Sequence, residues 1–145
     1  MITLPKQPPN FEMIAKAFPD VRTRKGVVYT YGGIIFNPDD GPIDEPLALH
    51  ESMHSLQQEA MGEKEKGPDR WWKKFIADPK FRKEQELEAF AVQYRRYCEL
   101  QLNRDRRAGY LIRLAENFSS PVYGSIVSKQ EAIKLIRHHA GVPEK

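Results

Sequence analysis

The stretch His50-Glu51-Ser52-Met53-His54 has the pattern H-E-x-x-H and lies in a segment with helix signals. Residues four apart lie on one face of a helix, so both imidazoles can reach one metal ion. A catalytic zinc ion takes neutral imidazole nitrogens as ligands and keeps one position for a water molecule. Glu51 is rotated off the histidine face, where its carboxylate can contact that water without coordinating the ion. The pattern therefore predicts His50 and His54 as zinc ligands and Glu51 as the catalytic base.

The helix that carries this pattern is predicted to begin after Asp44 and to end before Gly62. Aspartate is a favoured N-cap, and Pro46 suits the first turn. Beside the histidines runs an apolar stripe at helical spacing, formed by Leu49, Met53, Leu56 and Ala60. A partly buried histidine pair needs partners. A shared metal ion satisfies both imidazoles, and the alternative is that each bonds to a backbone carbonyl.

The segment before this helix predicts a small sheet. Residues 27–31 and 34–36 are β-branched and aromatic runs on either side of Gly32-Gly33, which is typical of one or two hairpins. Residues 37–42 form a loop by composition. A short helix through Phe18 precedes the sheet, and Asn10 is its predicted N-cap.

The segment after this helix predicts further helices. Residues 63–67 are expected to be an exposed loop, and a short helix from Pro68 carries apolar side chains typical of a core: Trp71, Trp72, Phe75 and Ile76. Helices are then predicted at about 81–103, at 105–118 and after Ser128, which forms a capping box with Glu131. The expected fold is α+β and mostly helical, with a small N-terminal β-sheet or hairpin packed beside the helix of residues 44–60. Residues 1–145 are expected to form one domain.

Composition excludes several classes of protein. The chain has 145 residues, 40% of them hydrophobic and 30% charged, and a net charge of +3. Its apolar runs are too short to span a bilayer and no signal peptide is evident, so we expect no membrane partner and a cytoplasmic location, with association with a particle as the alternative. The single cysteine, Cys98, is expected to pack in the core.

The basic residues are not massed into one long block, and Lys73-Lys74, Arg95-Arg96, and Arg104 with Arg106-Arg107 are local groups on predicted helices. Such pairs are typical of solvated helix faces, and no recognised nucleic-acid motif accompanies them. Nucleic acid is therefore a disfavoured partner, and the oligomeric state is not indicated.

A third protein ligand is expected from the helix predicted at 81–103. Glu86 and Glu88 lie about 200° apart around that helix, so they cannot both face one metal ion. Glu86 falls within the apolar arc, formed by Leu87, Phe90, Ala91, Tyr94, Tyr97 and Cys98, whereas Glu88 falls on the opposite face. A carboxylate in an apolar arc is costly unless it is paired or bound to a metal. Glu86 is therefore the predicted ligand, and the alternative is a buried salt bridge to Arg82.

The combination of H-E-x-x-H with a later Glu86-Leu87-Glu88-Ala89 resembles the gluzincin group of zinc metallopeptidases. The resemblance covers roughly residues 27–98 and extends to compact peptidase-like domains of bacteria and their phages, which carry glutamine after the motif, as Gln57-Gln58 does here. It implies a small sheet whose edge can hold an extended peptide. Several such families place an acid four residues after the glutamate ligand, where this chain has Phe90, so support for a histidine must come from elsewhere.

The resemblance implies hydrolysis of peptide bonds in a peptide or protein substrate, with one Zn²⁺ per chain. Glu51 would activate a zinc-bound water and pass its proton to the leaving amine. The group usually adds a donor for the oxyanion, and Tyr123 and Tyr94 are the candidates in this chain. Two other classes stay open: a zinc-bound interaction module with weak or no turnover, and a basic particle-assembly or nucleic-acid-binding protein whose histidine pattern is accidental.

Overall fold

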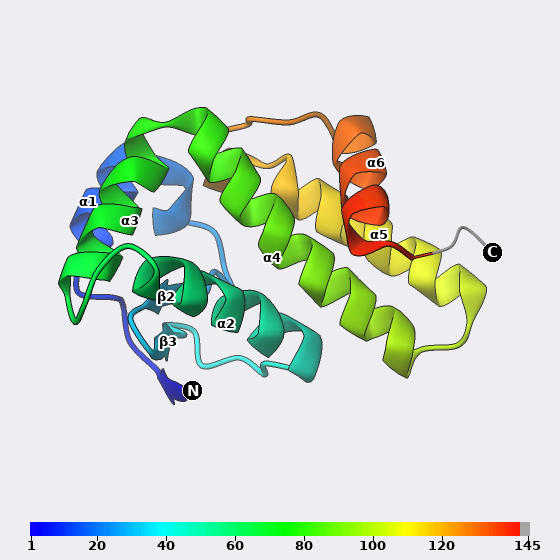
Figure 1. Ribbon diagram of the computed structural model, residues 1–145, viewed down its shortest axis with the longest axis horizontal. Coiled ribbons are helices and arrows are strands. Elements are labelled where there is room, and N and C mark those ends of the chain that lie inside the picture. The colour runs from blue at the N-terminus through cyan, green and yellow to red at the C-terminus, as the bar shows by residue number, and fades with distance from the viewer. Residues whose placement is uncertain (143–145) are drawn as a thin grey trace.

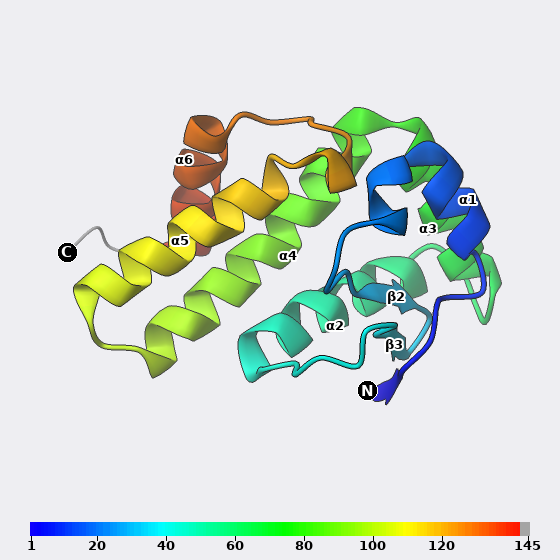
Figure 2. The ribbon, with the colours of Figure 1, turned by 180° about the vertical axis from the view of Figure 1, so that it is seen from behind.

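Helix α4 (Pro79–Leu100) runs through the middle of the molecule, and the other elements pack along its two sides (Figure 1). The computed structural model describes residues 1–142. Helix α2 (Glu45–Glu59) lies along one side of α4, whereas α5 (Arg104–Phe118) and α6 (Lys129–Ala140) cover the other. Seen from behind, α1 (Phe11–Ala17) and α3 (Lys66–Ala77) lie together beyond one end of α2 (Figure 2). The fold is α+β and mostly helical, as expected.

The sheet has three strands in the order β1-β3-β2, and β2 pairs with β3 antiparallel. Strands β2 (Tyr29–Tyr31) and β3 (Ile34–Phe36) confirm the predicted hairpin, in which Gly32 has a φ of +65° at the first turn position. Strand β1 (Ile2–Leu4), which pairs with β3 in parallel, was not predicted. Three residues with one distant partner strand carry too short a pattern to be recognised.

Helix α2 buries its polar face and leaves part of its apolar stripe in solvent. Asp44 caps it as predicted, because its carboxylate accepts a hydrogen bond from the Leu47 N–H. Leu56 of the stripe is 60% exposed, and the buried side chains are instead those of Pro46, His50, Glu51, His54, Gln57 and Gln58. The histidines face α4 and β2, where hydrogen bonds rather than apolar contacts satisfy them.

The other helices follow the sequence with small differences. Helix α3 begins at Lys66, two residues before the predicted Pro68, and α4 ends at Leu100, before the predicted Asn103. Asn10 occupies the predicted N-cap position of α1, but among the described residues its side chain makes no capping hydrogen bond. Ser128 caps α6 by accepting the Glu131 N–H.

Two apolar clusters form the core. One joins α4, α5 and α6 and contains the buried Cys98. The other joins α1, α3, the hairpin and the short helices η1 (Pro19–Arg22) and η2 (Pro121–Tyr123), and it contains Trp71, Trp72 and Phe75. Tyr123 packs against both clusters.

Most side chains of the basic groups noted above lie in solvent, including Lys73-Lys74 and Arg104. Among residues 1–142, none of the helices combines the length and the hydrophobicity that crossing a bilayer requires.

Candidate metal centre

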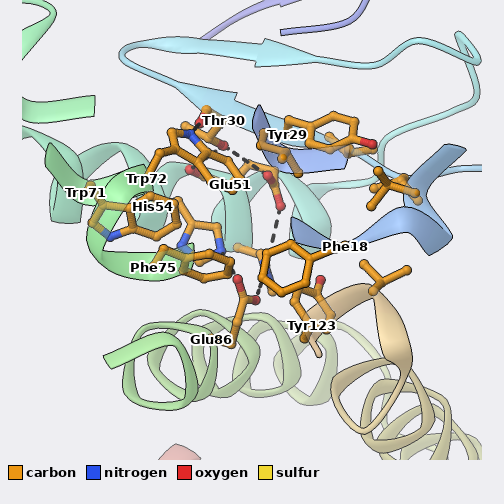
Figure 3. Close-up of a pocket in the computed structure, with 16 residues that line it drawn as sticks. Phe18, Tyr29, Thr30, Glu51, His54, Trp71, Trp72, Phe75, Glu86 and Tyr123 are labelled. Atoms are coloured by element: carbon orange, nitrogen blue, oxygen red, sulfur yellow. Dashed lines mark hydrogen bonds and ion pairs between the residues drawn. The ribbon is translucent and has the colours of Figure 1, made fainter. Parts of the chain in front are cut away.

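Buried polar groups of α2, α4 and β2 meet in one pocket (Figure 3). His50, Glu51 and His54 come from α2, and Glu86 rises toward them from α4. All four residues are at most 5% exposed. Trp71 lies beside His54, with ring centroids 5.1 Å apart. Water therefore has little access to these charges, so they must be balanced locally.

Glu86 joins the two imidazoles. Its Oε2 lies 3.0 Å from Nε2 of His54, and its Oε1 lies 3.2 Å from Nε2 of His50. Within residues 1–142, no ion pair joins Glu86 to Arg82, whose guanidinium instead donates to the carbonyls of Phe75, Ile76 and Tyr123. The structure thus places Glu86 where the ligand prediction needs it, and the alternative salt bridge to Arg82 is not formed.

The Nδ1 atom of each imidazole is hydrogen-bonded to a glutamine. Nδ1 of His54 lies 2.8 Å from Oε1 of Gln57, and Nδ1 of His50 lies 2.9 Å from Oε1 of Gln93. The Gln57 amide must have this orientation, because its Nε2 donates to the carboxylate of Glu88 at 3.0 Å. An amide oxygen only accepts, so Nδ1 of His54 carries the proton and the lone pair of the neutral ring is on Nε2. In the part of the chain that the structure describes, neither histidine ring bonds to a backbone carbonyl, which was the alternative.

The donor atoms that remain have the chemistry of a metal site. Two imidazole Nε2 atoms and a carboxylate converge, and Oε1 of Glu86, although 3.2 Å from Nε2 of His50, is buried and makes no hydrogen bond within residues 1–142. Neutral imidazoles would turn lone pairs toward an anion, so the arrangement requires a proton or a cation between them. Donors bound tetrahedrally at about 2.0–2.1 Å lie about 3.3 Å apart. The observed 3.0 and 3.2 Å between Glu86 and the imidazoles are close to that separation.

Glu51 lies on the edge of this donor set. One donor atom each from His50, Glu51 and His54 lie within 4.8 Å of one another, so this buried group could hold a metal ion. Oε1 of Glu51 accepts a hydrogen bond from the Thr30 hydroxyl at 2.9 Å, and Oε2 lies 3.6 Å from Nε2 of His50. Glu86, by contrast, approaches both imidazoles. Glu86 thus lies within 3.2 Å of both imidazole Nε2 atoms, and Glu51 lies at the edge of the set.

The electrostatics distinguish the two carboxylates. Burial would raise the pKa of Glu86, but the facing imidazoles of His54 and His50 lower it to about 2. Burial would lower the pKa of His54, but Glu86 raises it to about 9. For Glu51, burial raises the pKa more than His50, His54 and the Thr30 hydroxyl lower it. Glu86 is thus the firmly ionised carboxylate, and Glu51 is the one whose environment favours holding a proton.

Of the two predicted tyrosines, only Tyr123 reaches this centre. It lines the same cavity, and burial together with the nearby carboxylates of Glu86 and Glu51 holds its pKa well above its usual value. Arg82 donates to the Tyr123 carbonyl at 2.8 Å and fixes the turn that carries it. Tyr94 lies in the cluster of α4, α5 and α6, next to Cys98, and does not line the cavities at the centre.

Two cavities open from the centre. One, of about 40 Å³, extends between β2 and the aromatic side chains of α3, with Trp72 and Phe75 in its wall (Figure 3). The other, of about 330 Å³, extends along residues 24–28 toward the N-terminal half of α2. Both are lined by His50 and Glu51, so the centre lies where they meet.

Thr30, Gln57 and Gln93 were given no role by the sequence analysis. Gln57 follows His54 by three residues, and Gln93 follows Glu86 by seven, so both lie on the side of their helices that faces the candidate centre. That spacing was a usable signal. Thr30 is 21 residues from Glu51, and only the folded chain brings the two together.

No protein-family model, curated protein or solved structure matches this chain. What the centre does must therefore be argued from its own geometry and chemistry.

Proposed function

We propose that this chain is a zinc-dependent hydrolase that cleaves peptide bonds. The observation that carries the proposal is the convergence of Nε2 of His50, Nε2 of His54 and the Glu86 carboxylate, with Glu51 beside them. Two imidazoles and one carboxylate form a common ligand set of catalytic zinc sites, and three protein ligands leave a position for water. Such convergence of buried polar groups argues against an accidental histidine pattern.

His50, His54 and Glu86 would hold the ion. When bound, zinc would polarise the scissile carbonyl and lower the pKa of a water molecule toward about 7. The glutamine partners Gln57 and Gln93 keep the imidazoles in the orientation that presents Nε2.

Glu51 is suited to move the proton. Thr30 fixes Oε1, so Oε2 is the oxygen left to accept a proton from the attacking water and to return it to the leaving amine. A raised pKa assists this role, because the carboxylate must hold the proton between the two transfers. Tyr123 keeps its hydroxyl proton and can donate a hydrogen bond to the oxyanion.

One observation favours a second candidate, a zinc-bound interaction module with little or no turnover. The acid that several peptidase families use to support a histidine is absent at Phe90, and neutral amides support both imidazoles here. An amide polarises an imidazole less than a carboxylate does. This second candidate has the same metal site and differs only in catalysis.

A metal assay on the purified full chain tests the site. We expect about one zinc per chain after equilibration with zinc and removal of the excess. A chain that holds no zinc would refute both candidates.

Digestion of a peptide library then separates the enzyme from the module. We expect cleavage by the zinc-loaded protein and its loss in Glu51→Gln, which should still bind about one zinc per chain. Glu59→Gln is the matched control, because Glu59 lies exposed on the same helix, and it should cleave normally. Full zinc content without cleavage of any peptide would support the module instead.

A further inference from the structure

The 40 Å³ cavity beside the centre ends among core side chains, which gives it the character of a side-chain pocket. Ile14, Phe18, Trp72 and Phe75 contribute to its wall, and each is at most 6% exposed. His54, Glu51 and Glu86 form its floor. A group placed here lies directly beside the bond that the centre would cleave.

Strand β2 is at the edge of the sheet, but on one side of the centre its outward backbone groups already have side-chain partners. The Thr30 carbonyl accepts hydrogen bonds from Nε2 of Gln58 at 2.9 Å and from Nε1 of Trp72 at 3.0 Å. Oε1 of Gln58 accepts from the Gly32 N–H at 2.8 Å, so this one amide occupies both positions that a neighbouring strand would use. An extended peptide therefore cannot pair with β2 beyond Thr30.

The other side of the centre is open. Val27 and Val28 precede Thr30 and line both cavities, and the larger one, of about 330 Å³, continues from them past Arg24, Lys25 and Gly26. A peptide chain can be accommodated in the larger cavity, whereas the small cavity, between residues 27–30 and the tryptophans of α3, has space for one small group. The cavities available to the two sides of a scissile bond would thus differ greatly in volume, at about 40 and about 330 Å³.

Size and charge restrict what the small cavity can hold. One water-sized probe needs about 10–15 Å³, and a cavity of about 150 Å³ holds benzene. At about 40 Å³ the cavity fits a compact aliphatic group and is too small for an aromatic ring or a long cationic side chain. An acidic side chain is disfavoured, because the lining includes the carboxylates of Glu51 and Glu86 but no lysine or arginine.

We infer that the small cavity is the specificity pocket of the centre and takes one compact aliphatic side chain next to the scissile bond. Its substrates are peptides with a valine-sized residue in this pocket and the remaining chain along Val27 and Val28 in the larger cavity. This inference rests on the proposed function, because it assumes that zinc is bound at His50, His54 and Glu86.

Binding of small hydroxamic acids to the zinc-loaded protein tests the inference without requiring turnover. The hydroxamate group chelates zinc, so its substituent probes the space beside the ion. In calorimetric titrations, isobutyrohydroxamate should bind roughly tenfold more tightly than acetohydroxamate, because two more carbons are buried. Phenylacetohydroxamate should bind at least about tenfold more weakly than isobutyrohydroxamate, because its ring does not fit.

Two valine substitutions provide a matched pair. Val122 lies where the small cavity adjoins the larger one and lines both, whereas Val127 lies in the other apolar cluster and lines neither; both are 8% exposed. Val122→Ala should reduce the preference for isobutyryl over phenylacetyl at least about threefold. Val127→Ala removes the same atoms from an equally buried position away from the centre, and it should leave the preference unchanged.

The possible failures are distinguishable. If the chain binds one zinc but has equal affinity for the three hydroxamates, or binds the phenylacetyl compound most tightly, the pocket assignment is wrong and the proposed function still stands. An equal change of preference in the two valine variants also overturns the pocket. Failure of the unaltered chain to bind zinc overturns both.

Discussion

Replacing Glu86 by glutamine is the sharpest test of the metal centre, because it removes one charge and almost no volume. Glu86 is 2% exposed and approaches both imidazoles, at 3.0 and 3.2 Å. A neutral amide is a poor replacement for an anionic ligand. Loss of an outer partner of a metal ligand typically weakens binding 10–100-fold, and loss of a direct ligand must exceed that. We expect zinc affinity to fall at least about 100-fold, which corresponds to about 2.8 kcal/mol.

The zinc-free Glu86→Gln protein should still fold, since the new amide can donate to an imidazole Nε2. Circular dichroism would verify this, and competition with a chelator of known affinity would measure the zinc dissociation constant. Two glutamates of α4 serve as controls. Glu84 is exposed, and Glu84→Gln should change nothing. Glu88 is exposed but accepts a hydrogen bond from Gln57, and an amide oxygen still accepts it, so Glu88→Gln should weaken binding less than tenfold.

The pattern among these variants decides the outcome. A strong loss of zinc affinity in Glu88→Gln with none in Glu86→Gln would mean that Glu88, and not Glu86, is the ligand. Equal and weak effects at both positions would leave the ion without a ligand from α4, and the resemblance to gluzincins would fail with it.

Three further predictions follow from the same contacts. His54→Ala should abolish stoichiometric zinc binding, and a full equivalent of zinc in the purified variant would contradict the site. Gln57→Ala leaves Nδ1 of His54 without its acceptor and should weaken zinc binding about 10–100-fold in the chelator assay, whereas unchanged affinity would mean that the glutamine only fills space. Zinc should raise the melting temperature of the unaltered chain, because a ligand of the folded state stabilises it, and a chelator should reverse the rise; a shift of equal size in His54→Ala would assign the effect to another site.

Local signals were sufficient for most helices and for the common face of the two histidines on α2. Asp44, Pro46 and Gly62 mark the ends of that helix, and the four-residue spacing of His50 and His54 sets their common face. Glu86 was identifiable because a carboxylate within an apolar arc requires a partner. These inferences depend only on helical periodicity, which a single sequence carries.

Contacts between distant segments could not be predicted. Strand β1 forms only by pairing with β3, and the hydrogen bond of Thr30 to Glu51 depends on how α2 meets the hairpin. The apolar stripe of α2 was misleading for a related reason. A hydrophobic pattern indicates the buried face only where apolar contacts fill the interior, and here hydrogen-bonding groups fill it.

The polar interface between α2 and α4 also has a consequence for how uniquely the two helices align. Apolar side chains tolerate sliding, because one methyl group packs against another in many arrangements. The contacts of Gln57 and Gln93 do not tolerate such sliding. A shift of α2 by one turn would break three contacts at once, those of His54 with Glu86, His50 with Gln93 and Gln57 with Glu88. The polar contacts of the centre therefore also fix the register of α2 along α4. Apolar replacements in this interface would improve packing but would remove the hydrogen bonds that select one register of α2 against α4.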